Sequence, residues 1–289
     1  MKRTFIDRDP GLLRPWIAKD GALLRFRLLG GEVPSASLRK VADIADQFGD
    51  GHVYLTSRAN LQIRGLPHSE GHFAPEFVEL LEATGLFPSR SHDLVRNYIV
   101  SGLTGRVGGR ADIRPVARKL DERLCADPEL AALPGLFWFS LDDGSGDVAH
   151  RSLDVGLVAV DETTAQIRIG SHQWGETVLL EDAPEVLLEY ARRFQMVRGV
   201  GNTALWHVDE LPARGREIMD REYSRDERTQ LEVPEPLPFG PIVQFDGKIA
   251  HHSEVADGSL RLAEAKSLAQ LSQVLIVTQW RSIIAPDRA

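Results

Sequence analysis

Two segments at opposite ends of the chain share the same order of sequence features. Each begins with Asp-Gly, at Asp20 and at Asp246, continues into apolar residues at helical spacing, and ends in a hydrophobic run that reaches Thr and Arg. The helical spacing covers 38–48 in the first segment and 260–271 in the second. Repeats separated by an intervening segment predict two similar halves packed around a pseudo-twofold axis.

Within the first repeat, the stretch from Leu55 to Leu66 alternates apolar and polar residues. If the stretch is one strand, its polar residues project in a row from one face, because side chains alternate along a strand. That row contains Thr56, Arg58, Asn60, Gln62 and Arg64. Arginine binds carboxylates with two parallel hydrogen bonds, so the row favours a strand that faces a ligand with several carboxylates. An exposed antiparallel strand without a ligand is the alternative.

Three further arginines lie on two other predicted strands. Arg25 and Arg27 share one face of a strand predicted over 22–28, and Arg96 lies on a strand predicted over 94–100. The latter strand runs into the Gly-rich loop 102–110. Such a loop lets backbone N–H groups approach an anion, but this one matches no phosphate-loop motif. A surface turn is the alternative interpretation.

Composition restricts the class of ligand. The 289-residue chain has a formal net charge of -8, which disfavours nucleic acid and anionic membranes as partners. No apolar run is long enough for a signal peptide or a membrane span, so we expect a cytoplasmic protein. Cys125 is the one cysteine, which excludes disulfides within the chain and an iron–sulfur cluster ligated by its own cysteines.

The acidic turn from Asp142 to Asp147 lies between two predicted strands. It has the composition of a calcium loop, but it lacks the flanking helices and the Glu that ends such a loop. We therefore predict no metal site in the chain.

The predicted elements define an α+β chain with a duplicated architecture. We expect a first half-domain over 1–88, a larger α/β half-domain over 89–215, a charged, Pro-bearing linker over 216–238 and a second half-domain over 239–289.

Four motifs together resemble the nitrite/sulfite reductase family, and within it most closely the precorrin-3B synthases of aerobic cobalamin synthesis. They are the Arg-bearing stretch Leu55–Gly65, the pair Val95–Asn97 and Leu103–Gly105, the pair Leu133–Phe137 and Asp142–Gly144, and Thr278–Ser282. The resemblance implies ferredoxin-like half-domains and larger α/β half-domains that enclose a sirohaem coupled to a [4Fe–4S] cluster. It also implies that Arg58 and Arg96 face the tetrapyrrole.

Two departures from the family pattern change the expected chemistry. Sulfite and nitrite reductases carry a Lys pair where this chain has Leu136 and Trp138. Without those cations, reduction of a small oxyanion loses electrostatic stabilisation. The family's cluster cysteines belong to a second large half-domain, which we expect to be missing here. The resemblance therefore implies sirohaem or haem as cofactor, with a cluster-bearing partner chain or a homodimer completing the protein.

The resulting hypothesis is a precorrin-3B synthase-like monooxygenase that hydroxylates precorrin-3A. Two alternatives remain: a non-catalytic tetrapyrrole-binding or scaffold protein, and a cluster-free sirohaem or haem oxidoreductase. No catalytic residue is assigned. The residues expected to bind substrate or cofactor are Arg25, Arg27, Thr56, Arg58, Asn60, Gln62, Arg64, Arg96, Asn97, Arg106, Trp280 and Arg281.

Overall fold

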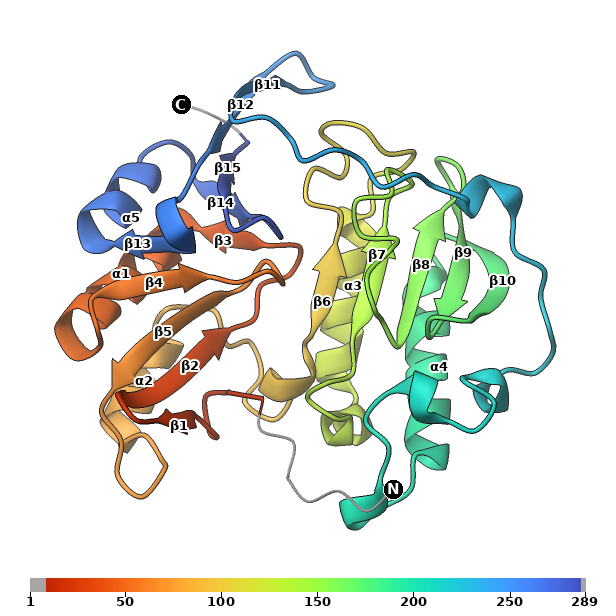
Figure 1. Ribbon diagram of the computed structural model, residues 1–289, viewed down its shortest axis with the longest axis horizontal. Coiled ribbons are helices and arrows are strands. Elements are labelled where there is room, and N and C mark those ends of the chain that lie inside the picture. The colour runs from red at the N-terminus through yellow and green to blue at the C-terminus, as the bar shows by residue number, and fades with distance from the viewer. Residues whose placement is uncertain (1–8, 287–289) are drawn as a thin grey trace. The chain divides into compact units, whose positions relative to one another are not determined.

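The structure is a computed structural model that describes residues 9–286, and these residues divide into two compact units (Figure 1). One unit, here called the duplicated unit, combines residues 9–93 with 236–286. The other, here called the middle unit, consists of residues 94–235. Residues 9–93 and 236–286 therefore come together in one unit, while the segment between them forms the other.

The duplicated unit contains two antiparallel five-stranded sheets. The first sheet consists, in spatial order, of β1 (Trp16–Ala18), β2 (Gly21–Phe26), β5 (Leu61–Leu66), β4 (His52–Leu55) and β13 (Ser259–Arg261). The second consists of β11 (Gly240–Val243), β12 (Ile249–Ser253), β15 (Ile283–Ala285), β14 (Val274–Val277) and β3 (Glu32–Pro34).

The two halves of the duplicated unit exchange one short strand each. Strand β3, from the first half, pairs with β14, and β13, from the second half, pairs with β4. Every position in one sheet thus has a counterpart in the other, including the exchanged edge strand. This arrangement explains the sequence repeat: neither segment completes a sheet alone, and the pseudo-twofold packing predicted from the repeat supplies the missing strand.

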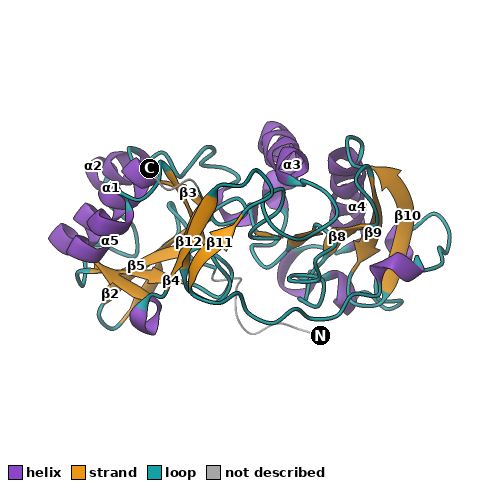
Figure 2. Ribbon diagram, turned by 90° about the horizontal axis from the view of Figure 1, so that it is seen from above, coloured by secondary structure: helices purple, strands orange, loops and turns teal. Residues whose placement is uncertain are grey.

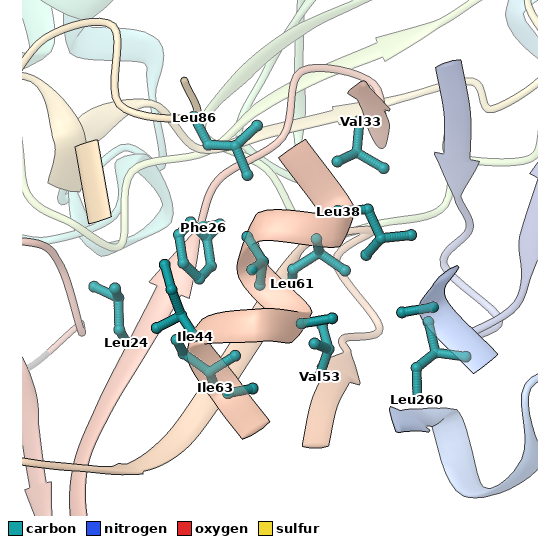
Figure 3. Close-up of a cluster of buried hydrophobic side chains, with 14 of the residues drawn as sticks. Leu24, Phe26, Val33, Leu38, Ile44, Val53, Leu61, Ile63, Leu86 and Leu260 are labelled. Carbon is teal, nitrogen blue, oxygen red and sulfur yellow. The ribbon is translucent and has the colours of Figure 1, made fainter. Parts of the chain in front are cut away.

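One hydrophobic core holds both sheets of the duplicated unit together. The helices are α1 (Ser35–Phe48), α2 (Pro75–Glu82) and α5 (Leu262–Leu268), and Figure 2 shows them grouped on one side of β2, β4 and β5. Fully buried side chains such as Phe26, Leu38 and Leu61 lie between α1 and the strands (Figure 3). Each such side chain stabilises the fold by about 1.5–3 kcal/mol relative to an exposed one.

The middle unit is built on a single mixed sheet. Its strands, in spatial order, are β10 (Gln173–Leu179), β9 (Thr164–Ile169), β8 (Val155–Ala159), β7 (Phe139–Asp142) and β6 (Tyr98–Val100). Strands β6, β7 and β8 are parallel, and every residue of β8 is buried. Helices α3 (Arg114–Ala126) and α4 (Ala183–Val197) lie on one side of the sheet (Figure 2). The burial of β8 on both of its faces is typical of a strand with a parallel neighbour.

After α4 the chain continues in 3-10 turns, among them Arg216–Ile218 and Glu227–Thr229. Gln166 of β9 fastens this segment to the sheet, because its amide donates to Ser224 O at 2.8 Å and accepts from Asp226 N at 2.8 Å. The segment predicted as a linker is therefore tied by side-chain hydrogen bonds to the middle unit.

The structure confirms the predicted α+β fold class but corrects some elements. The stretch Leu55–Leu66 is not one strand, because β4 ends at Leu55 and β5 begins at Leu61. Strand β14 likewise ends before Thr278, and α5 is shorter than the predicted helix over 260–271. In the turns that follow β4 and β14, a Thr hydroxyl accepts hydrogen bonds from backbone N–H groups. The alternation of apolar and polar residues does not reveal such turns.

No helix among residues 9–286 is long and apolar enough to span a membrane.

Candidate functional site

The turn between β4 and β5 positions Arg58. Thr56 Oγ1 accepts hydrogen bonds from Arg58 N at 3.3 Å and Asn60 N at 3.1 Å, and Thr56 N donates to Asn60 O at 2.9 Å. Ala59 adopts a left-handed conformation with φ of 56°, which reverses the chain. Arg58 therefore projects from a closed turn and not from a strand.

Three arginines gather beside this turn. Arg25 and Arg27 both donate to the Asp9 carboxylate, with Arg27 Nη2 at 2.6 Å from Asp9 Oδ2. Arg27 also donates to Pro10 O at 3.0 Å and lies 3.6 Å from the Asp93 carboxylate. We call Arg25, Arg27 and Arg58 the arginine cluster.

Within the arginine cluster, the surroundings disfavour the charged form of Arg58. Burial lowers the pKa of Arg58, and the neighbouring charges of Arg25 and Arg27 lower it further, while Asp9 acts in the opposite direction. Burial and like charges each disfavour a cation. An anion placed beside Arg58 would offset both effects by favouring the cation.

Two buried donors, one in the arginine cluster and one beside it, have no acceptor among residues 9–286. Asn60 is 1% exposed, and its Oδ1 accepts from Leu28 N at 2.8 Å, but its Nδ2 donates to nothing. The Nε of Arg25 is likewise buried without an acceptor. An unsatisfied buried donor costs about 1–3 kcal/mol, so both are unusual in a finished core.

Gln62 and Arg64 lie farther along the same sheet. Gln62 pairs across the strands with Arg25, which places both side chains on one face. The exposed Arg64 guanidinium lies 5.3 Å from the centre of the Tyr54 ring, and it donates to Gln62 when the Gln62 amide oxygen faces it, at 2.8 and 3.2 Å. This pair extends the polar face of the first sheet beyond the arginine cluster.

The second half repeats the turn with other side chains. Thr278 Oγ1 accepts from Trp280 N and Ser282 N, both at 3.2 Å, and Arg281 has φ of 59°. The two turns therefore align on their threonines. Trp280 stands where the first turn has Arg58, and Arg281 stands where it has Ala59. The sequence repeat had matched Arg281 with Arg58. The structure corrects this match, because Arg281 lies one residue beyond the position equivalent to Arg58.

The remaining predicted residues belong to the middle unit. Arg96 donates through Nε and Nη2 to the Asp121 carboxylate of α3, at 2.7 and 2.9 Å. Burial disfavours the Arg96 cation, but Asp121 more than offsets this and the pKa of Arg96 is raised. Asn97 Nδ2 donates to Leu94 O and Gly135 O, at 2.8 and 2.9 Å. Both residues thus hold the middle unit's own structure together.

Arg106 is partly buried in the Gly-rich loop, where its backbone N donates to Leu103 O at 2.9 Å. Of the predicted residues, nine lie in the duplicated unit and Arg96, Asn97 and Arg106 lie in the middle unit. The structure brings Arg25, Arg27, Arg58 and Asn60 together within one unit.

The acidic turn is held by its own hydrogen bonds. Asp142 carboxylate oxygens accept from Gly144 N at 2.8 Å, Gly146 N at 3.0 Å and Val148 N at 3.1 Å. Carboxylate oxygens of Asp142, Asp143 and Asp147 lie within 4.8 Å of one another. Burial raises the pKa of Asp143 to about 6. The Asp142 carboxylate is thus the acceptor that closes the turn.

Asp9 is the site residue that sequence reasoning missed. It joins Arg25 to Arg27, yet it lies in an irregular N-terminal stretch before Pro10, without periodicity or motif. A carboxylate that acts on residues more than a dozen positions away leaves no local signal. Only the fold reveals it.

Comparisons with known proteins agree with this architecture. Residues 17–70 match the nitrite/sulfite reductase ferredoxin-like half domain. The chain is 30% identical over 139 residues to a ferredoxin–nitrite reductase of Synechococcus elongatus, covering 46% of this chain and 27% of the relative. It is 24% identical over 252 residues to sulfite reductase [ferredoxin] 2 of Mycolicibacterium paratuberculosis, covering 78% of this chain and 43% of the relative.

Among solved structures, the NirA protein of Mycobacterium tuberculosis superposes with a TM-score of 0.71 at 19% identity, covering 97% of this chain and 58% of that one. That likeness concerns the fold. The chain spans less than half the length of these curated relatives.

Residues 17–70 thus match the nitrite/sulfite reductase ferredoxin-like half domain, and beyond them the chain is similar to proteins named nitrite and sulfite reductases. The resemblance inferred from the four motifs is confirmed at this level, and so is the ferredoxin-like fold.

Proposed function

We propose that the duplicated unit binds a carboxylate-rich tetrapyrrole at the arginine cluster, in a precorrin-3B synthase-like protein. The observation that carries the proposal is the gathering of Arg25, Arg27 and Arg58 beside one turn. Precorrins and sirohaem carry acetate and propionate groups around a tetrapyrrole macrocycle. Several guanidiniums converging at one place match that chemistry better than they match a single small anion.

Energetics supports the same ligand class. A charge-assisted hydrogen bond contributes roughly 1.5–3 kcal/mol when it is partly shielded from water. The unpartnered N–H groups of Asn60 and Arg25 would each gain an acceptor from a ligand carboxylate. The lowered pKa of Arg58 would rise again beside that carboxylate. The residues present therefore fit sirohaem or a precorrin, with Arg58 as the main carboxylate ligand.

Reduction of nitrite or sulfite fits less well. The positions of the family's Lys pair hold Leu136 and Trp138, and Trp138 is 5% exposed in an apolar cluster with Ile99 and Val148. Apolar side chains cannot stabilise charge on an oxyanion. Hydroxylation of precorrin-3A is therefore favoured, and non-catalytic tetrapyrrole binding is the second candidate.

Redox chemistry needs a group that these residues do not supply. A bound sirohaem or haem supplies the redox centre when present, while the arginine cluster orients its carboxylates. A [4Fe–4S] cluster requires four cysteine thiolates, and this sequence has one cysteine. We propose that any cluster comes from a partner chain, and that the two ferredoxin-like half-domains of this chain span residues 1–88 and 239–289.

The test is an anaerobic spectral titration with sirohaem and, separately, with precorrin-3A, followed by exposure to oxygen and mass analysis. Saturable binding is expected for at least one ligand. A mass gain of one oxygen atom in precorrin-3A identifies the synthase activity, and binding without a mass change identifies the non-catalytic candidate. Absence of saturable binding to both ligands would refute the proposal.

A further inference from the structure

A pair of arginines in the middle unit is separate from the arginine cluster and from the four family motifs. Arg168 of β9 and Trp174 of β10 are direct cross-strand partners. The Arg168 guanidinium carbon lies 6.0 Å from the centre of the Trp174 ring, and that of Arg225 lies 4.8 Å from the same centre. Two cations from distant parts of the sequence thus converge on one indole.

Neutral acceptors hold both guanidiniums in place. Arg225 donates through Nε to Thr229 Oγ1 at 2.9 Å and through Nη2 to Thr229 O at 2.7 Å. Arg168 donates through Nη1 to Ala149 O. The Gln166 amide that binds Ser224 O and Asp226 N fixes the backbone on either side of Arg225. The pair is therefore positioned in advance, and each guanidinium keeps a further nitrogen for a ligand.

The arrangement lacks the carboxylates that usually accompany arginine in this unit. Neither Arg168 nor Arg225 forms an ion pair with a carboxylate among residues 9–286. Ion pairs with Asp or Glu are made instead by Arg96, Arg114, Arg123, Arg192, Arg193 and Arg228.

The proximity of the two cations is unfavourable for the protein alone. Burial lowers the pKa of Arg168, and the charge of Arg225 lowers it further, whereas Asp209 and Asp142 raise it only from a distance. The indole face attracts cations but does not neutralise them. Like charges held together by neutral anchors in a chain of net charge -8 indicate a missing anion.

We propose that Arg168 and Arg225, positioned on Trp174, together bind the phosphate group of a small ligand. A phosphate offers three acceptor oxygens and carries close to two negative charges at neutral pH, so it can bridge two guanidiniums and balance both. Arg225 is exposed and Arg168 is partly exposed, so a ligand can reach them from solvent. The site is independent of the arginine cluster.

The experiment is ¹⁹F NMR of the full chain labelled with 5-fluorotryptophan, titrated with inorganic phosphate at constant ionic strength set by sodium chloride. The chain has five tryptophans, and the Trp174→Phe variant assigns the signal of Trp174. A saturable shift of that signal is expected with phosphate. Chloride alone, or acetate as a carboxylate probe, is expected to bind at least tenfold more weakly.

The variants Arg168→Gln and Arg225→Gln are each expected to weaken phosphate binding at least tenfold. Because Arg225 is exposed, its variant retains the fold even if Arg168→Gln does not. Arg221→Gln is the matched control, since Arg221 is an exposed arginine 4.8 Å from the ring centre of Tyr223 with no second arginine on that ring. The proposal is overturned by an unshifted Trp174 signal, by equal affinity in Arg225→Gln and Arg221→Gln, or by acetate binding as tightly as phosphate.

Discussion

The two turns of the duplicated unit have one backbone and two different sets of side chains. In both, a threonine hydroxyl accepts two backbone N–H groups and a left-handed residue closes the turn, Ala59 in one and Arg281 in the other. The first turn places Arg58 in a group of cations. The second places Trp280 at that position.

The difference extends to the neighbouring strand. Arg25 lies opposite Gln62 in the first half, and His252 lies opposite Ile284 at the matching position in the second. His252 uses its ring nitrogens within the protein, with Nε2 at 2.6 Å from Ser282 Oγ and Nδ1 at 3.1 Å from Pro238 O. The duplicated frame thus carries a strained polar group on one side and a satisfied one on the other, which is why we assign ligand binding to the first.

The largest effect is expected from the two glycines that precede the exchanged strands. A Cβ at Gly31, where φ is 73°, would lie 2.1 Å from the backbone oxygen of Val277. A Cβ at Gly258, where φ is 64°, would meet the flexible side chain of Arg281 at 2.9 Å. Gly31→Ala should therefore cost roughly 3–5 kcal/mol, from overpacking and backbone strain together, and Gly258→Ala about 1–2 kcal/mol.

Urea unfolding of both glycine variants measures this difference. Equal losses of stability would contradict the strand exchange as described, because they would mean that the close approach of Gly31 to β14 is not maintained.

A smaller effect is expected when the threonines that close the turns are replaced. Thr56→Val and Thr278→Val each remove a hydroxyl that accepts two backbone N–H groups, which should cost about 1–3 kcal/mol. Thr278→Val should be the worse of the two, since its hydroxyl is buried and also contacts Ser282 Oγ at 2.5 Å. Chemical denaturation of the pair provides the measurement, and a larger loss for Thr56→Val would reverse the comparison.

The dependence of stability on pH should also differ between the halves. Burial lowers the pKa of His252 below its usual value near 6.5. The unfolded chain then binds the proton more readily, so stability is full above about pH 6.5 and is lost as the pH falls toward the lowered pKa. His252→Gln should show a shallower decline between about pH 7 and pH 5.

This pH effect is read as the difference between wild type and variant in denaturant unfolding at each pH. Asp143, with its pKa raised to about 6, has the opposite influence, since its contribution grows as the pH falls. It is present in both proteins and cancels. Identical pH profiles would show that His252 does not titrate differently on folding.

The smallest effect on stability is expected from Arg58→Gln. The substitution removes a guanidinium that burial and the charges of Arg25 and Arg27 disfavour. We expect a change of no more than about 1 kcal/mol, in the stabilising direction. A loss above about 2 kcal/mol in thermal or urea unfolding would indicate that Arg58 serves the fold and not a ligand.

Much of the frame could be predicted from the sequence, because it depends on local patterns. The apolar spacing that defines α1 and α4 and the repeat of features in the two ends are both visible in the residues themselves. The exchange of β3 and β13 is not visible, since each is a three-residue strand whose partner lies more than 200 positions away. Such pairing depends on tertiary packing and not on propensity.

The candidate site was also predictable only in part, because residue types can be seen in the sequence and tertiary contacts cannot. Residue type alone selected Arg25, Arg27 and Arg58, which the fold gathers. It could not show that Asp121 engages Arg96, or that Asp9 joins two of the cluster's arginines. The Arg168–Trp174–Arg225 group was missed, because cross-strand pairing and a distant segment create it.

The central claim is that the cations of the first turn bind the carboxylates of a tetrapyrrole. Its most direct measurement is the sirohaem dissociation constant of wild type, Arg58→Gln and Arg90→Gln, from anaerobic absorbance titrations. Arg90 is an exposed arginine of the same unit, paired with Glu82, and provides the matched control. We predict at least tenfold weaker binding for Arg58→Gln alone, and equal dissociation constants in all three proteins would contradict the claim.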